Sequence, residues 1–261
     1  MAEVSAAAAG TVKLGDITIN RLGLGTNRIS DNDQSRTILR HAIARGINFI
    51  DTADKYGASE EIIGQTLAPY PKSAVIATKG GWSQDNSPRS LEDKINNSLR
   101  LLKLDRLPLW QLHRMDPSVP IEQTMEFLKT QQAAGKIQHI GLSEVSIEQI
   151  EAARQIVPIV SVQNHYNLEM RQHEDVVDYC TQNGVVFMPF FPLSSGGSSN
   201  DSKLQAVAKK YRATPIQIAI AWLLKRSPIM LPIPGTLSPE HLDENIAAAA
   251  IELSDEDFSS L

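Results

Sequence analysis

The chain has 261 residues, of which 42% are hydrophobic and 21% charged, with 15 glycines, 14 prolines and one cysteine. This is the composition of an ordinary folded protein, and it excludes a disordered or collagen-like chain. The 25 basic and 30 acidic residues leave a formal net charge of −5. We therefore expect no nucleic-acid partner, because the phosphate backbone is bound by basic surfaces.

Nothing in the sequence indicates membrane insertion or export. No apolar run approaches the roughly 18 residues that a membrane-spanning helix needs. The first ten residues contain Glu3 and no Lys or Arg, unlike a secretory signal with its basic start. The lone Cys180 has no partner for an internal disulfide, which fits a reducing compartment. We expect a cytoplasmic protein without a membrane partner.

The chain begins with residues 1–10, which we expect to be a flexible start. Two short alternating segments, 12–14 and 17–19, flank Gly15 and Asp16 and predict a β-hairpin. Eight short apolar runs then predict strands. They lie near residues 22–25, 47–51, 74–79, 109–113, 139–143, 159–163, 185–189 and 229–233.

Longer amphipathic segments alternate with these runs and predict helices. They lie near residues 34–45, 59–68, 90–102, 120–134, 146–156, 171–183, 202–211, 214–225 and 238–248. Ser90 and Ser146 precede acidic residues and are expected to cap helix N-termini, while Gly135 and Gly184 are placed to end helices.

The alternation of strands and helices indicates an α/β fold with parallel strands and helical crossovers. Eight such units in a chain of this length favour a closed (β/α)8 TIM barrel with an N-terminal β-hairpin. A doubly wound open sheet is the alternative. Because no Pro-, Ser- or Gly-rich linker is long enough to separate two cores, we expect residues 11–261 to form one barrel domain.

Four residues at predicted strand ends suggest the chemistry. Asp51, Lys79 and His113 each close a strand, and Tyr56 follows Asp51 by five residues; the active sites of such barrels lie at this end. A neighbouring ammonium would lower the tyrosine pKa from about 10, and a carboxylate would hold the lysine. With no nucleophile–base pair and no metal-ligand spacing, the set predicts acid catalysis at a carbonyl, with the electrons supplied by a hydride donor.

From the hairpin to Asn245 the sequence resembles the aldo-keto reductase family. The matching stretches are 23–26, 46–57, 77–80, 112–113, 139–143, 162–167 and 233–236. The resemblance implies a nicotinamide-dependent carbonyl reductase without a metal. In it Tyr56 is the acid, Asp51 and Lys79 tune that acid, and His113 orients the substrate oxygen.

The resemblance also implies an extended dinucleotide across the barrel mouth. Ser143 and Gln163 would hold the nicotinamide carboxamide, and Phe190 would stack on the ring. The other expected contacts are Gly25 and Thr26, the loop residues Pro192, Leu193, Ser194 and Gly196, and the late residues Gly235, Thr236, His241, Glu244 and Asn245.

Two departures from the family pattern affect the cofactor. Gly235 and His241 stand where many members have Lys and Arg, so NADPH is favoured but NADH remains open. Glu144 stands where the family generally has Asn. A carboxylate only accepts hydrogen bonds, and its charge would favour the oxidised nicotinamide if it faced the ring. The alternative is a side chain turned toward solvent or a nearby cation.

The substrate is less defined than the reaction. Trp82, just beyond Lys79, is expected to face the substrate, whereas strand alternation turns Trp110 into packing. The segment 189–193 and the late Pro-Gly-Thr are similar to a bacterial branch that includes pyridoxal reductases. Pyridoxal, methylglyoxal and aromatic aldehydes are the candidate substrates, and the family's habit is monomeric.

Two other functions remain open. Relatives of this family serve as channel-associated β subunits, which makes a cofactor-sensing binding protein the alternative from another class. A lysine at a barrel strand end also suits Schiff-base chemistry, with Lys79 as the nucleophile.

Overall fold

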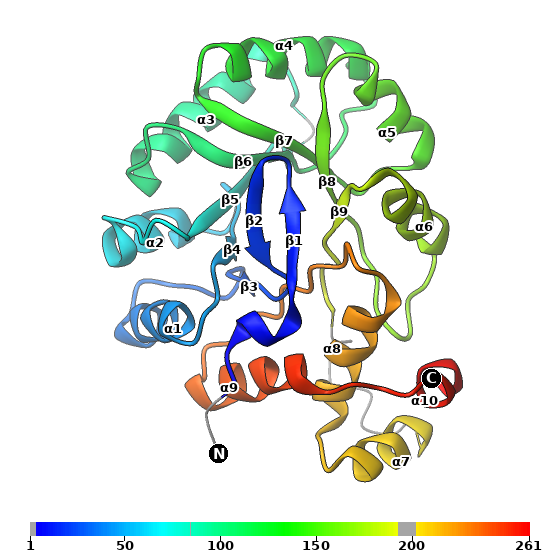
Figure 1. Cartoon of the computed structure of the whole chain (residues 1–261). Helices are drawn as coiled ribbons and strands as arrows, with labels where there is room; N and C mark the ends of the chain where they lie inside the picture. The colour runs from blue at the N-terminus through cyan, green and yellow to red at the C-terminus, as the bar shows by residue number, and fades with distance from the viewer. Residues whose placement is uncertain (1–3, 84, 193–201) are drawn as a thin grey trace.

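Seven parallel strands curl around the middle of the molecule (Figure 1). The computed structural model describes residues 4–83, 85–192 and 202–261. Each strand pairs with the next one in the sequence, in the order β3 to β9. The strands are β3 Leu24–Gly25, β4 Phe49–Asp51, β5 Val75–Gly80, β6 Leu107–Leu112, β7 Ile137–Ser143, β8 Ile159–Gln163 and β9 Val186–Phe187. This consecutive order excludes the doubly wound sheet, in which the strand order reverses.

Residues 229–233 occupy the eighth position and join the two edges of the sheet. The Leu231 N–H donates to the Phe187 carbonyl at 2.9 Å, and the Gly23 N–H donates to the Pro232 carbonyl at 3.0 Å. The predicted eighth strand is therefore in place but is not a regular strand. Pro232 within it and Pro234 directly after it carry no N–H and cannot donate to a ladder.

Helices surround the sheet in Figure 1. The nine predicted helices are α1 Asp33–Ala44, α2 Ser59–Leu67, α3 Pro88–Leu102, α4 Ile121–Ala133, α5 Ile147–Arg154, α6 Glu174–Asn183, α7 Ser202–Tyr211, α8 Pro215–Arg226 and α9 Pro239–Ala247. Each packs an apolar face inward, as α3 does with Leu91, Ile95 and Leu102. None of the helices described is long and apolar enough to cross a membrane.

The helix ends follow local capping chemistry. Ser146 caps α5 with a reciprocal capping box, as predicted, and Gly184 ends α6 in the left-handed conformation. Ser90 is not a cap, because α3 begins earlier, at Pro88, with Ser87 as its N-cap. Proline suits the first turn of a helix, where its missing N–H is not needed. A tenth helix, α10 Asp255–Ser260, was not predicted.

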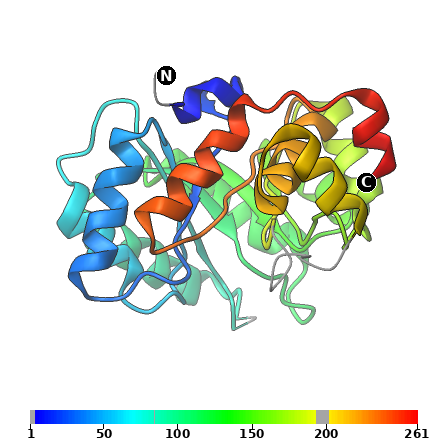
Figure 2. The same cartoon turned by 90° about the horizontal axis from the view of Figure 1, so that it is seen from below.

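The predicted hairpin, β1 Thr11–Leu14 and β2 Ile17–Asn20, covers one end of the barrel (Figures 1 and 2). Its turn residue Asp16 contacts the first half of β7, where the Asp16 Oδ1 lies 2.6 Å from the His139 ring nitrogen Nε2. The hairpin therefore lies over the amino ends of the strands. A ligand has to enter from the other end.

The described residues of the expected flexible start, 4–10, form local structure that packs against the barrel. Ala6–Ala9 form a short 3₁₀ helix, η1, capped by Ser5. Ala6 is fully buried, and its N–H donates to the Arg45 carbonyl at 3.0 Å. Small alanine side chains let this turn pack closely, and the backbone bond anchors it to the end of α1.

Candidate active site

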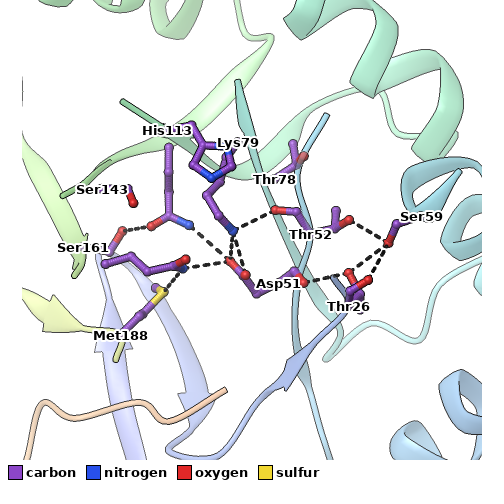
Figure 3. Close-up of polar contacts among 12 residues, drawn as sticks. Thr26, Asp51, Thr52, Ser59, Thr78, Lys79, His113, Ser143, Ser161 and Met188 are labelled. Carbon is purple, nitrogen blue, oxygen red and sulfur yellow. Dashed lines mark hydrogen bonds and ion pairs between the residues drawn. The ribbon is translucent and has the colours of Figure 1, made fainter. Parts of the chain in front are cut away.

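A buried ion pair lies at the centre of the site (Figure 3). The Lys79 Nζ donates to both carboxylate oxygens of Asp51, at 2.7 and 2.6 Å, and to the Thr52 carbonyl at 2.9 Å. All three ammonium donors are thus used. Burial lowers the pKa of Lys79, and the Asp51 carboxylate opposes that shift. Charges this deep in a core persist only when they are paired.

Two glutamines fix the Asp51 carboxylate from across the barrel. The Gln163 amide donates to Asp51 Oδ1 at 3.0 Å, and the Gln111 amide does so at 3.3 Å. The Gln163 nitrogen also contacts the Met188 sulfur, at 3.7 Å, which leaves its carbonyl oxygen for a ligand. Trp110, on the opposite side of its strand from Gln111, is fully buried, so its packing role is confirmed.

Tyr56 and His113 line a cavity of about 760 Å³ at the carboxyl ends of the strands. Their rings meet edge to face, with centroids 6.1 Å apart. The centroid of the Trp82 ring lies 4.7 Å from that of the His113 ring, and Trp82 is 40% exposed. The cavity is within the range of roughly 300 to 1,000 Å³ that is typical of small-molecule and cofactor sites.

The pKa of Tyr56 differs from the sequence expectation. Burial raises it, the Asp51 carboxylate raises it further, and Arg114 opposes them. The Lys79 Nζ lies 5.4 Å from the Tyr56 ring centre, but Asp51 balances its charge. The prediction that Lys79 lowers this pKa is therefore wrong for this geometry. The phenol keeps its proton at neutral pH and can donate it.

His113 is a neutral imidazole. Burial and the positive charges of Lys79, Arg114 and Lys55 lower its pKa to about 2. Its Nδ1 is buried without a hydrogen-bond partner in the described chain. An unpaired buried acceptor is better tolerated than an unpaired N–H, which favours the tautomer with hydrogen on Nε2.

Most of the predicted cofactor residues line the same cavity. They are Gly25, Thr26, Ser143, Gln163, Phe190, Pro192, Gly235, Thr236, His241, Glu244 and Asn245, and Trp82 lines it with them. Leu193, Ser194 and Gly196 lie outside the described residues. Two loops far apart in the sequence, one after β3 and one after residue 233, therefore reach the mouth that holds Tyr56.

Glu144 does not line this cavity. It adopts a left-handed conformation, with φ of 54°, and its Oε1 accepts the His165 backbone N–H at 2.8 Å. Its charge raises the pKa of Arg114 against the lowering by burial. In this geometry the carboxylate is turned away from the cavity, toward a backbone amide and a nearby cation.

The backbone approaches itself closely beside the cavity. A Cβ on Gly25 would lie 2.6 Å from the Ile233 carbonyl oxygen, and one on Gly235 would lie 2.9 Å from the Gly25 carbonyl oxygen. Thr26 donates to the Asp51 carbonyl at 2.8 Å and accepts from Ser59 (Figure 3). Only glycine permits this approach, which brings the 233–236 segment next to the end of β3.

Sequence reasoning did not assign nine residues of the cavity wall to the site. They are Asn27, Arg28, Lys55, Gly57, Arg114, Phe191, Ile216, Ile233 and Pro234. Lys55 and Arg114 directly adjoin Tyr56 and His113, so adjacency to a strand-end residue was the available signal. In the described chain, no cluster of His, Cys, Asp or Glu has the grouping that a metal ion needs.

A neutral imidazole and a protonated phenol at one cavity suit a carbonyl oxygen, which accepts hydrogen bonds from both. The fold and the site are therefore those of a carbonyl oxidoreductase with a barrel fold. Comparison with known proteins agrees. The chain belongs to the aldo/keto reductase family, whose model matches residues 20–261.

Relatives match over nearly the full length. An uncharacterised oxidoreductase of Schizosaccharomyces pombe is 42% identical, over 99% of this chain and 90% of its own. Pyridoxine 4-dehydrogenase of Escherichia coli is 39% identical, over 96% of both chains. The resemblance to the family is thus confirmed.

Solved structures share the fold. The thermostable aldo-keto reductase Tm1743 has a TM-score of 0.88 at 30% identity, covering 95% of this chain and 97% of its own. An aldo/keto reductase from Klebsiella pneumoniae, in complex with NADP and acetate, has a TM-score of 0.87 at 28% identity, covering 95% and 93%. The predicted barrel class is confirmed.

Proposed function

We propose that the protein is an NADPH-dependent reductase of aldehydes and ketones in which Tyr56 is the proton donor. The observation that carries this is the placement of a protonated Tyr56 and a neutral His113 at one cavity, above the Asp51–Lys79 pair. Relatives support the cofactor, because an aldo-keto reductase from Klebsiella pneumoniae was solved with NADPH and a Schizosaccharomyces pombe relative is named for NADP(+).

The cavity fits a dinucleotide in its size and its walls. Ser143, Gln163 and Phe190 would hold the nicotinamide end. The adenosine end would meet the first turns of α9, where His241 and Asn245 line the cavity and the helix N-terminus suits a phosphate. Arg28 adds a positive charge. NADH is the competing donor, because Gly235 and His241 replace the cations of many relatives.

The bound cofactor would supply a hydride to the carbonyl carbon. The His113 Nε2–H would donate to the carbonyl oxygen and orient it. As negative charge develops there, the Tyr56 hydroxyl would give its proton to that oxygen, which completes the alcohol. The tyrosinate left behind would regain its proton from solvent before the next turnover.

The alternatives have less support. A Schiff base on Lys79 is disfavoured because its three donors are occupied and it does not line the cavity. A cofactor-sensing protein is disfavoured because Asp51, Tyr56 and His113 are all present beside Lys79. Pyridoxal is the first substrate to try, since one relative is a pyridoxine 4-dehydrogenase. We also propose a monomer in the cytoplasm.

The test is the loss of NADPH absorbance when purified protein is mixed with pyridoxal, methylglyoxal or benzaldehyde, with NADH run in parallel. We expect NADPH to be oxidised with at least one of them. Tyr56→Phe should keep NADPH affinity and lose turnover by at least about a hundredfold, the contribution typical of a positioned acid. Unchanged turnover in this variant would remove Tyr56 from its role. Tight NADPH binding without turnover would favour the sensing protein.

A further inference from the structure

Two cations converge on one aromatic ring at the cavity mouth. Lys55 follows β4 and Arg114 follows β6, and both line the cavity beside Tyr56. Both lie over the Trp82 ring, with the Lys55 Nζ 2.8 Å and the Arg114 Cζ 4.6 Å from the ring centre. Three successive loops thus place two positive charges next to the position expected for a carbonyl.

Neither cation forms an ion pair within the described protein, although Glu144 favours the charge of Arg114 and Asp54 that of Lys55 at longer range. The Asp54 carboxylate, which adjoins Lys55 in the sequence, forms its ion pair with Lys94 at 2.9 Å. The Glu144 carboxylate accepts the His165 N–H and is not within ion-pair distance of Arg114. No other acidic group in the parts of the chain described pairs with either cation.

One edge of the Arg114 guanidinium is free. Its Nη1 donates to the His113 carbonyl at 2.7 Å and to the Ser143 hydroxyl at 3.3 Å. Its Nε and Nη2 donate to no described residue. These two groups form the edge with which arginine binds a carboxylate or phosphate through two parallel hydrogen bonds.

Holding these like charges together is unfavourable. Burial lowers the pKa of Lys55, and the Arg114 charge lowers it further. The whole chain has a formal net charge of −5, so the positive character of this wall is local. A ligand with a negative charge would relieve the repulsion, while one without it would leave two unpaired cations beside the reacting group.

We propose that the preferred substrate is a carbonyl compound that also carries a carboxylate or a phosphate. Lys55 and Arg114 hold the anionic group against Trp82, while the carbonyl oxygen faces Tyr56 and His113. The inference rests on the proposed reductase function and adds two specificity-determining residues to it. It also explains why Arg114 is braced by Ser143 rather than by an acidic side chain.

The test compares matched substrates within each protein. 4-Carboxybenzaldehyde is paired with its neutral methyl ester, and pyridoxal 5′-phosphate with pyridoxal, each with NADPH. The readout is the ratio of kcat/KM for the anionic member to that for the neutral member. The pair with the larger ratio identifies whether the group is a carboxylate or a phosphate. We expect a wild-type ratio of at least about ten, as charge-assisted bidentate pairing gives.

The variants Lys55→Gln and Arg114→Gln should each reduce this ratio about tenfold, mainly through KM for the anionic substrate. Arg114→Lys, which keeps the charge but loses the planar fork, should fall between wild type and Arg114→Gln. The control is Lys129→Gln, an exposed cation on α4 whose ion pair is with Glu126. It changes the net charge equally and should leave the ratio unchanged.

Two results would overturn the inference while the proposed function stands. One is a wild-type protein that reduces the neutral aldehydes as well as the anionic ones, with a ratio of kcat/KM near one. The other is a set of variants in which kcat/KM falls equally for both members of a pair, which would mean that the cations only position Trp82. If NADPH is not oxidised in the presence of any of the aldehydes, the proposed function fails. Calorimetric titration with 4-carboxybenzaldehyde then decides the anion site: binding that both variants weaken supports it, and absence of binding rejects it.

Discussion

The Lys79 ammonium lies 5.4 Å from the centre of the Tyr56 ring but donates its three hydrogens to the two Asp51 carboxylate oxygens and the Thr52 carbonyl. The pair is therefore internally balanced. Its net field at the phenol is small, so the pair leaves the proton on Tyr56, whose pKa burial and the Asp51 carboxylate raise.

This balance predicts how substitutions of the pair affect stability. Lys79→Met leaves the Asp51 carboxylate buried and unpaired, and Asp51→Asn does the same to the ammonium. Each single variant should lose about 3–5 kcal/mol of unfolding free energy. The double variant should be more stable than either single one and should still lack turnover. Urea unfolding with NADPH oxidation in parallel measures both. Additive losses would show that the two groups do not act as a pair.

The neutral state of His113 predicts a specific acid sensitivity. Its pKa in the folded protein is about 2, against about 6.5 for an unfolded histidine. Above pH 6.5, His113 is neutral in both the folded and the unfolded protein, so its titration does not reduce the unfolding free energy there. As the pH falls below it, the unfolded chain takes up a proton that the folded protein does not. The unfolding free energy therefore decreases between pH 6.5 and pH 2.

At pH 5 the expected loss from this group is about 2 kcal/mol relative to pH 7. His113→Gln should remove that part of the pH dependence, which chemical denaturation at the two pH values measures. His173→Gln is the matched control, since that side chain makes no hydrogen bond to cap α6. Equal pH dependence in His113→Gln and wild type would argue against a neutral His113.

Much of the site could be predicted because strand ends are readable from sequence. Asp51, Lys79 and His113 each close a short apolar run, and parallel strands bring such ends to one mouth. The direction of the Tyr56 pKa could not be predicted, because it depends on burial and on how fully Asp51 compensates Lys79. Both are properties of packing. The prediction of a regular eighth strand at 229–233 was wrong, because the apolar run was given more weight than Pro232, which cannot donate a hydrogen bond to a neighbouring strand.

The position of Glu144 yields a prediction about cofactor affinity. Its carboxylate accepts the His165 N–H and does not line the cavity, so Glu144→Asn should change the ratio of NADP⁺ to NADPH affinity by less than about twofold, well under the tenfold that 1.4 kcal/mol represents. Asparagine tolerates the left-handed backbone at this position. Calorimetric titration with both cofactor forms measures the ratio. A large shift toward NADPH in the variant would mean that the charge does act on the nicotinamide.

The close approach of the two glycine segments predicts a non-additive pair of substitutions. Gly25→Ala would set a methyl group 2.6 Å from the Ile233 carbonyl oxygen, and Gly235→Ala one at 2.9 Å from the Gly25 carbonyl oxygen. Neither glycine has a positive φ, so the obstacle is space rather than backbone conformation. Each variant should lose about 1–3 kcal/mol of unfolding free energy and bind NADPH more weakly, with Gly25→Ala the worse.

Both methyl groups force apart the same two segments, the end of β3 and the chain after residue 233. Once one substitution has separated them, the second meets less resistance, so the double variant should lose clearly less than the sum of the single losses. Urea unfolding of the four proteins gives this coupling. If the losses of unfolding free energy are strictly additive, the two contacts are independent. The position of the segment that closes the barrel would then not depend on the close contact between these two glycines.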